Sequence, residues 1–108
     1  MTAPELEPAA VAAAMDTGDL SVVDVREPVE WDAGHIAGSV LIPLGEFADR
    51  LDELPEGQLA IVCRTGSRSS MAADWLHRSG VPASNMTGGL KAWAAVGLPL
   101  DPADGRVA

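Results

Sequence analysis

The sequence predicts one α/β domain, in which a parallel β-sheet carries helices on both faces. Apolar segments of strand length alternate along the chain with helix-length amphipathic segments, and this repeated strand-then-helix order is typical of parallel sheets. The 108 residues leave room for one hydrophobic core and none for a second domain. We therefore expect a single domain over residues 1–100, followed by a loose C-terminal tail at residues 101–108.

The expected strands are short runs of β-branched and other apolar residues between turn-forming residues. They span residues 20–25, 39–42 and 59–63, with a further short strand at residues 84–87. Pro43 closes the second of these runs. The run Leu-Ala-Ile-Val-Cys at 59–63 is the most apolar of the four, so we expect a buried strand there.

The expected helices begin and end at proline, glycine or serine residues. They span residues 8–15, 28–33, 46–54 and 90–96. A fifth helix is expected to begin with Ser67 or a neighbouring serine as its N-cap and to end before Gly80.

Apolar side chains recur at helical spacing in two of these helices. The first group is Phe47, Leu51 and Leu54, and the second is Met71, Ala72, Trp75 and Leu76. We expect both groups to face the core, and we expect the three tryptophans of the chain to anchor that core, at Trp31, Trp75 and Trp93.

The chain is acidic, with a formal net charge of -9, but its charges are unevenly spread. Thirteen of its sixteen acidic residues lie in residues 1–59, with only two of its seven basic residues. Such acidity argues against nucleic acid or an anionic membrane as a partner. No apolar run approaches the ~20 residues of a membrane span, and the N-terminus lacks the pattern of a signal peptide. We therefore expect a soluble, cytoplasmic protein.

The chain has a single cysteine, Cys63, which cannot form an internal disulfide. One cysteine and two scattered histidines are too few ligands for a cysteine-based zinc site, so we expect no metal. A free thiol of this kind is typical of a reducing compartment.

Cys63 ends the most apolar strand and is followed by the loop Arg64-Thr65-Gly66-Ser67-Arg68. In α/β folds, ligands bind at the loops that follow the carboxyl ends of strands. Gly66 permits a tight turn into the next helix, so backbone amides, a helix N-terminus and two arginines would converge on one point. This setting favours a thiolate nucleophile over the alternative, a structural cysteine of the core.

The size of the required pKa shift defines how much free energy the loop must supply. An ordinary cysteine with a pKa of ~8.5 is only about 3% thiolate at pH 7. Lowering this pKa by about two units takes roughly 2.7 kcal/mol. A helix N-terminus gives about 0.3–1 kcal/mol, or ~2 kcal/mol when partly buried. We therefore expect the loop amides, Arg64 and Arg68 to contribute the remainder.

Four motifs follow one another along nearly the whole chain: DVREPVEW at 24–31, GHIAGSVLIP at 34–43, CRTGSRS at 63–69 and GGLKAW at 88–93. Each is weak alone, but in this order and spacing they resemble the single-domain rhodaneses. The resemblance implies a five-stranded parallel sheet with helices on both sides. It also implies that Cys63 takes up a sulfane sulfur, in a pocket lined by residues 64–68.

The resemblance implies an enzyme of the thiosulfate sulfurtransferase type. It would take a sulfane sulfur from a small anionic donor such as thiosulfate, or from a persulfide, and pass it to cyanide or a thiol. The sulfur would be held as a persulfide on Cys63, without a metal or organic cofactor, and the substrate-binding residues would be Arg64, Thr65, Gly66, Ser67 and Arg68.

Two alternatives stay open at this point. One is a persulfide carrier or regulatory binding module that is loaded by a partner protein. The other is a phosphatase-like or arsenate-reducing cysteine enzyme. Four residues separate Cys63 from Arg68, whereas cysteine phosphatases have five and so a larger cradle that fits phosphate. The shorter loop favours sulfur transfer.

Four other polar residues lie in the motifs that carry the resemblance. We expect Asp24 and Arg26 to tie neighbouring loops together by hydrogen bonds and ion pairing, and Glu30 to pair with Arg26 four residues earlier. We interpret His35 as a hydrogen-bonded structural residue rather than a general base, because a thiolate at Cys63 needs no base.

Overall fold

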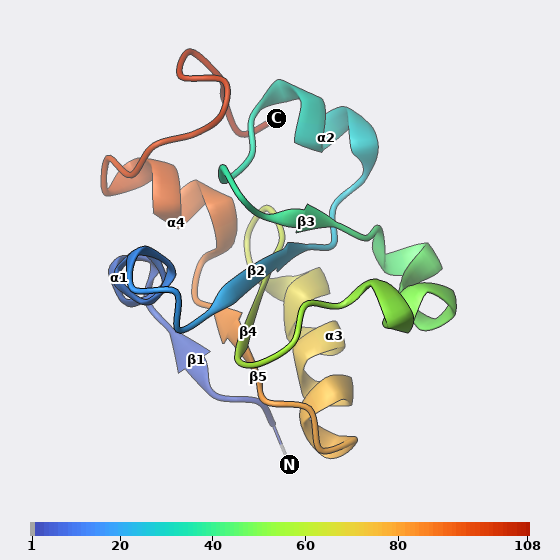
Figure 1. Ribbon diagram of the computed structural model, residues 1–108. Helices are drawn as coiled ribbons and strands as arrows, with labels where there is room; N and C mark the ends of the chain where they lie inside the picture. The colour runs from blue at the N-terminus through green and yellow to red at the C-terminus, as the bar shows by residue number, and fades with distance from the viewer. Residues whose placement is uncertain (1) are drawn as a thin grey trace.

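A five-stranded parallel sheet forms the middle layer of the computed structural model, which describes residues 2–108 (Figure 1). The strands are β1 (Glu5–Leu6), β2 (Ser21–Asp24), β3 (Val40–Leu41), β4 (Leu59–Val62) and β5 (Ala83–Met86). They lie in the order β1-β5-β4-β2-β3, and every neighbouring pair is parallel. The predicted fold class is therefore confirmed.

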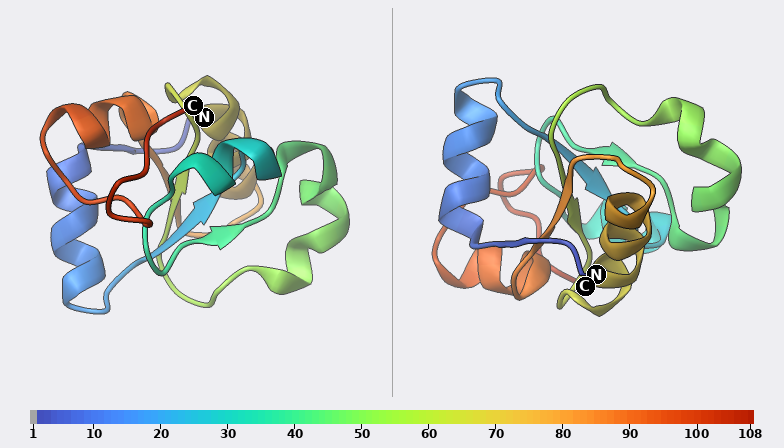
Figure 2. Two further views of the ribbon diagram at one scale, coloured as in Figure 1. Left: turned by 90° about the horizontal axis from the view of Figure 1, so that it is seen from above. Right: turned by 90° about the horizontal axis from the view of Figure 1, so that it is seen from below.

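Helices cover both faces of this sheet. They are α1 (Pro8–Asp16), α2 (Pro28–Ala33), the 3₁₀ segment η1 (Leu44–Glu53), α3 (Ser67–Arg78) and α4 (Gly89–Ala95). Helices α1 and α4 lie on one face, and α3 and η1 lie on the other (Figures 1 and 2). Within the described residues, none of these helices has the length and apolar character that crossing a bilayer requires.

Alternation along the strands divides the core into two layers, because successive side chains of a strand point to opposite faces. Val22, Ala60 and Val62 pack with residues of α1 and α4, among them Trp93. The side chains between them in the sequence pack instead with residues of α3 and η1. Cys63 continues this second set and belongs to the layer beneath α3.

The strand order places β4 at the centre, between β5 and β2. The chain runs outward from β2 to the edge strand β3, returns to β4 and then proceeds to β5 on the other side. The order therefore reverses between β2 and β4, and in open α/β sheets the carboxyl ends of strands at such a reversal form the binding crevice. Asp24 ends β2 and Cys63 follows β4, so both stand at this crevice.

Two elements differ from the sequence prediction. Strand β1 was not expected, since Glu5–Leu6 has only two residues and becomes a strand by pairing with Asn85 and Met86 of β5. The helix expected at 46–54 is a 3₁₀ segment with a kink at Arg50. That kink turns Leu51 outward, where it is 39% exposed, while Phe47 stays buried.

The apolar stripe expected on the helix after Ser67 is only half buried. Ala72 and Leu76 pack into the core, but Met71 is 60% exposed and Trp75 is 37% exposed. Trp75 lies edge-on against Phe47 of η1, at a centroid separation of 6.1 Å. The buried face of α3 consists of Ser69, Ala72, Ala73 and Leu76. Of the three tryptophans, only Trp93 is a fully buried anchor.

Residues 101–108 are not a loose tail, as the sequence suggested, but are bonded to the segment after α2. Asp101 exchanges two backbone hydrogen bonds with His35, at 2.7 and 3.1 Å. Further along, the Arg106 amide donates to the carbonyl of Ala33 at 2.9 Å, and Val107 packs against the core layer beneath α4. These long-range contacts cannot be read from the composition of the tail.

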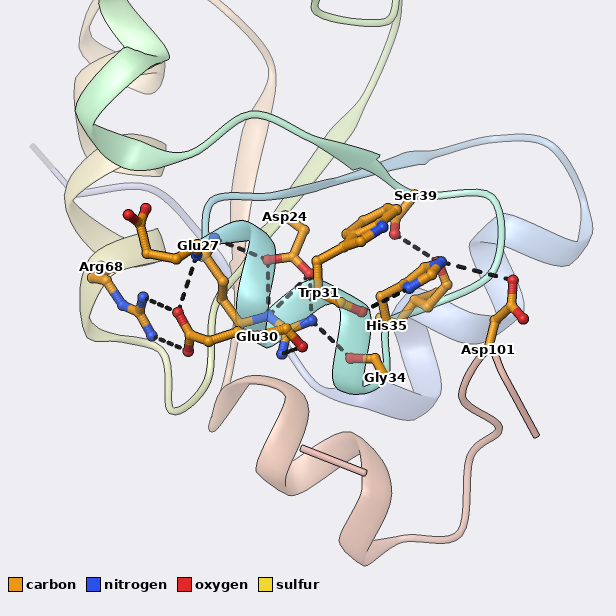
Figure 3. Close-up of polar contacts among 11 residues, drawn as sticks. Asp24, Glu27, Glu30, Trp31, Gly34, His35, Ser39, Arg68 and Asp101 are labelled. Atoms are coloured by element: carbon orange, nitrogen blue, oxygen red, sulfur yellow. Dashed lines mark hydrogen bonds and ion pairs between the residues drawn. The ribbon is translucent and has the colours of Figure 1, made fainter. Parts of the chain in front are cut away.

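A completely buried ion pair fixes α2 over the end of β2 (Figure 3). The Arg26 guanidinium donates to both carboxylate oxygens of Asp24, at 2.8 to 3.1 Å. It also donates to the carbonyl of Glu30 within the helix (3.3 Å) and to that of its C-cap Gly34 (2.9 Å). These contacts are those of a structural role, as expected for Asp24 and Arg26.

We predict that Arg26→Met lowers the free energy of unfolding by about 3–5 kcal/mol, because it leaves the Asp24 carboxylate buried without an opposite charge. Urea unfolding of the purified variant measures this loss. Arg50→Met is the matched control, since Arg50 pairs with Glu46 and Glu53 at the surface. The control should lose far less stability because its ion pairs are exposed to solvent, and equal losses in the two variants would contradict the prediction.

Candidate active site

The candidate site is built around Cys63, the residue that follows β4. Its side chain is completely buried, and the chain turns at Gly66 directly into α3. Gly66 is the N-cap of α3, with φ of 107°, which glycine adopts far more readily than any other residue. The expected serine N-cap is therefore wrong, because the turn needs left-handed backbone at this position. The tight turn brings the first amides of α3 back over the sulfur.

Hydrogen-bond donors converge on the Cys63 sulfur from this turn. The Gly66 amide donates to Sγ at 3.1 Å. The Ser69 hydroxyl lies 3.2 Å from Sγ and comes from the first turn of α3. Backbone amides of Thr65 and Ser69 also act on the thiol. Dipoles that surround one sulfur in this way favour its anion.

Two opposing effects determine the pKa of Cys63. Burial removes the thiolate from water and raises the pKa, and it is the largest single influence. The hydrogen bonds of the Ser69 side chain and of the Ser69, Gly66 and Thr65 amides lower the pKa and together outweigh burial. The pKa of Cys63 therefore lies below its ordinary value. A thiol that is both buried and acidified has the character of a nucleophile.

Helix α4 supports the loop from the other side. The amides of Leu90 and Lys91 donate to the carbonyls of Cys63 (2.8 Å) and Arg64 (3.0 Å). A Cβ at Gly89 would come within 2.6 Å of backbone atoms of both acceptor residues. Glycine is thus required where the start of α4 meets the loop. This explains on physical grounds the paired glycines that open the last helix.

Arg68 binds a carboxylate of α2 rather than standing free at the sulfur (Figure 3). Its two terminal nitrogens donate to the two carboxylate oxygens of Glu30, at 2.7 and 2.9 Å. We expected Glu30 to pair with Arg26, but Arg26 reaches only the Glu30 carbonyl. Hydrogen bonds from the amides and the Ser69 hydroxyl, more than the arginines, account for the lowered pKa of Cys63.

The other predicted loop residues lie at the outer side of the turn. Thr65 and Ser67 are exposed, and Arg64 is half-buried. The Arg64 Nε donates to the Ala108 carbonyl at 3.1 Å, which brings the end of the described chain to the loop. Substrate binding by residues 64–68 remains a prediction. Across residues 2–108, His, Cys, Asp and Glu side chains do not gather in a group of three that could hold a metal ion.

Sequence reasoning missed two residues next to the sulfur, Ser69 and Asn85. Ser69 follows Arg68 directly, so the serine-rich run itself was the signal that a hydroxyl would face the cysteine. Asn85 lies on β5, where its side chain meets the Ser69 hydroxyl and the Gly66 carbonyl. Nothing in the local sequence indicates this contact, because it depends on β5 lying beside β4.

His35 is held by contacts with Trp31 and Asp101 (Figure 3). Its Nδ1 lies 3.0 Å from the Trp31 carbonyl, and its ring stacks on the Trp31 ring at 3.7 Å. Its Nε2 lies 3.7 Å from the Asp101 carboxylate. These contacts fit the structural interpretation of His35.

Comparison with known proteins places these features in a family. The family model described as "Rhodanese-like domain" matches residues 7–96. Among solved structures, a rhodanese-related protein from Thermoplasma volcanium superposes with a TM-score of 0.84 at 30% sequence identity, over 90% of this chain and 96% of that one.

Three curated relatives have similar sequences. A protein from Allochromatium vinosum named sulfurtransferase is 37% identical, over 79% of this chain and 81% of its own. The probable adenylyltransferase/sulfurtransferase MoeZ of Mycobacterium tuberculosis is 41% identical over 74% of this chain, which spans 22% of MoeZ. The putative sulfur carrier protein YrkF of Bacillus subtilis is 38% identical over 83% of this chain, which spans 50% of YrkF.

We predict that the Glu30–Arg68 pair makes stability depend on pH in the acid range. The hydrogen bond from Arg68 lowers the pKa of Glu30 from 4.5 to about 2. The stabilisation is therefore complete above pH 4.5 and is lost as the pH falls toward 2. At pH 7, Glu30→Gln should be less stable by about 1 kcal/mol, and this difference should shrink as the pH falls.

Urea unfolding at pH 7, 4 and 3 measures the difference. Glutamine can still accept the Glu27 amide bond that Glu30 accepts at 3.0 Å, so the variant removes the charge and keeps the cap. Arg68→Met should show the same pH dependence. A deficit that stays constant from pH 7 to 3 would show that the pair does not act through its charges.

Proposed function

The chain belongs to the rhodanese-like domain family, and from this premise we propose that it is a sulfurtransferase that carries a sulfane sulfur as a persulfide on Cys63. One observation supports this proposal above the others. The Cys63 thiol lies where the Gly66 amide and the Ser69 hydroxyl converge, so that its anion is stabilised. A nucleophilic sulfur with a ring of donors is what sulfur uptake requires.

The proposed reaction has two steps. The Cys63 thiolate attacks the outer sulfur of thiosulfate, the sulfur–sulfur bond of the donor breaks, and sulfite leaves with the bonding electron pair. The acceptor, cyanide or a thiolate, then attacks the outer sulfur of the persulfide. The bond between the two persulfide sulfurs breaks, and its electron pair returns to Sγ. Neither step needs a metal or an organic cofactor.

Arg64 is the loop cation best placed to attract an anionic donor. Arg68 already binds the Glu30 carboxylate, whereas Arg64 is bonded only to a carbonyl among the described residues. At ~0.15 M salt the Debye length is about 8 Å, so this local charge outweighs the acidic residues farther along the chain. The proposal assigns donor binding to Arg64 and support of the turn to Gly66.

The loop must move for the donor to reach the sulfur. Cys63 has no exposed surface in this arrangement. A thiol shielded in this way is also protected from adventitious oxidation, and the reducing cytoplasm is the compartment that suits it best.

We predict that wild-type protein gains one sulfur when it is incubated with thiosulfate, and that Cys63→Ser gains none. Intact mass spectrometry detects the added sulfur, and a reducing thiol should remove it. Sulfur transfer to cyanide should be lost in the same variant. Full turnover by Cys63→Ser would exclude the proposed mechanism.

Assays of sulfur uptake, sulfur transfer and phosphate hydrolysis separate the alternatives. A sulfur carrier, suggested by the likeness to YrkF, would accept sulfur from a protein persulfide but turn over poorly with thiosulfate and cyanide. Hydrolysis of an aryl phosphate without any sulfur adduct would indicate a phosphatase-like enzyme.

We predict that Arg64→Ala raises the KM for thiosulfate by about three- to tenfold and leaves kcat nearly unchanged, because it removes attraction for the donor but not the nucleophile. Steady-state assays with cyanide as acceptor measure both constants. Arg78→Ala, at the far end of α3 in an exposed position, is the matched control and should behave like wild type. An equal rise of KM in both variants would attribute the effect to overall charge.

A further inference from the structure

The Ser69 hydroxyl faces two acceptors with one hydrogen. Its Oγ lies 3.2 Å from Cys63 Sγ and 2.5 Å from Asn85 Oδ1. A hydroxyl can donate to only one of them at a time. All three side chains are buried, so water cannot easily replace the bond that is given up. Cys63 and Asn85 therefore compete for the same hydrogen.

The orientation of the Asn85 amide is fixed by its other contacts. Its Nδ2 donates to both carboxylate oxygens of Glu5, at 3.2 Å each, and to the Gly66 carbonyl at 3.3 Å. A flipped amide would point Oδ1 at these three oxygens, which can only accept. The backbone amide of Asn85 also donates to the carbonyl of Pro4, next to β1, at 2.9 Å. Oδ1 is thus held toward Ser69.

We propose that Asn85 is a positioning residue that controls the direction of the Ser69 hydroxyl, and through it the hydrogen bond that the Cys63 sulfur receives. The short strand β1 takes part, because it supplies the Glu5 carboxylate that holds the amide in place. Asn85 acts through Ser69 and does not itself touch the sulfur.

Two arrangements of hydrogens follow from this geometry. In the thiol form, the S–H of Cys63 donates to Ser69 Oγ, and the Ser69 hydroxyl donates to Asn85. When the thiol loses its proton to solvent, the hydroxyl turns to the thiolate, and Asn85 Oδ1 gives up its bond. That lost bond opposes ionisation. Asn85 therefore restrains the thiolate, whereas Ser69 stabilises it.

The same switch applies to the proposed reaction, on which this part of the inference rests. In the persulfide the charge lies on the outer sulfur, and the Ser69 hydroxyl donates to Asn85. When the acceptor removes the outer sulfur, the electron pair returns to Sγ and the hydroxyl turns to meet it. The hydrogen bond to Asn85 thereby keeps the Ser69 hydroxyl in place until the leaving thiolate accepts it.

Other charged groups near Cys63 are the same in wild type and in an Asn85 variant. Arg68 interacts with both the Cys63 and Asp24 charges, and Glu30 interacts with Arg68 and Arg26. Further charged residues bonded to the loop or to Asn85 are Arg64, Lys91 of α4, whose amide donates to the Arg64 carbonyl, and Glu5 of β1. Replacement of the neutral Asn85 by neutral leucine changes none of these charges directly.

The test is a pH titration of the Cys63 thiolate, followed by its ultraviolet absorbance and by its rate of alkylation with iodoacetamide. The chain has one cysteine and no tyrosine, so both signals report on Cys63. Below the midpoint, Ser69→Ala should lower the thiolate fraction about tenfold. Asn85→Leu should raise it about threefold, and the double variant should match Ser69→Ala.

The increase in thiolate fraction expected for Asn85→Leu is opposite in sign to the change that a merely structural effect would cause. Loosening of the loop would remove amide bonds from the sulfur and so lower the thiolate fraction. An unchanged or lowered fraction in Asn85→Leu would overturn the proposal, and so would an increase that persists in the Ser69→Ala background. Alkylation needs no sulfur donor, so a failure to gain sulfur from thiosulfate would contradict the proposed function alone.

Glu5→Met provides a second variant in case Asn85→Leu does not fold, because Glu5 is exposed. Without the carboxylate, only the Gly66 carbonyl still holds the Asn85 amide, so Oδ1 restrains the Ser69 hydroxyl less firmly. The thiolate fraction should rise more in the wild-type background than in Ser69→Ala, where only the loss of a negative charge acts. Equal increases in the two backgrounds would refute the role of Asn85.

Discussion

The buried pair of Asp24 and Arg26 is the interaction on which the arrangement of the site depends. Helix α2 has no fully buried residue of its own, so hydrophobic packing holds it only weakly. The Arg26 guanidinium instead binds the carbonyls of Glu30 within the helix and of its C-cap Gly34 while it neutralises Asp24. The helix held in this way presents Glu30 to Arg68, in the first turn of α3. An ion pair at the end of β2 thus affects, through α2 and Glu30, the loop that follows β4.

Dipoles contribute more than full charges to the lowered pKa of the Cys63 thiol. Arg68, one of the two arginines of the loop, is bound by Glu30, and the donors to the Cys63 sulfur are amides and the Ser69 hydroxyl. Dipoles fixed by a helix and a tight turn need no reorganisation when charge develops on the sulfur. Neutral donors also leave Arg64 available for a donor anion. This separation of tasks lets an acidic chain hold a thiolate.

Helix and strand positions followed from local patterns wherever burial and periodicity agreed. The apolar run 59–63 became the central strand, and Pro28 and Gly34 bounded the short helix as predicted. The local patterns failed to predict burial and strand pairing where long-range packing decided them. Met71 and Trp75 are four residues apart, as on one face of a helix, but α3 buries Ala72 and Leu76 and leaves both Met71 and Trp75 exposed. Strand β1 exists only because β5 offers it an edge.

The sequence by itself determined the parallel α/β class, the place of Cys63 at the end of a buried strand and the tight turn at Gly66. These features depend on residues close together in the chain, where periodicity and backbone freedom act directly. Only the tertiary structure decided that Glu30 binds Arg68 instead of Arg26, that Asn85 competes with Cys63 for the Ser69 hydroxyl, and that residues 101–108 pack beside α2. Each of these contacts joins residues on different elements. Their partners are selected by the strand order of the sheet, which no local pattern specifies.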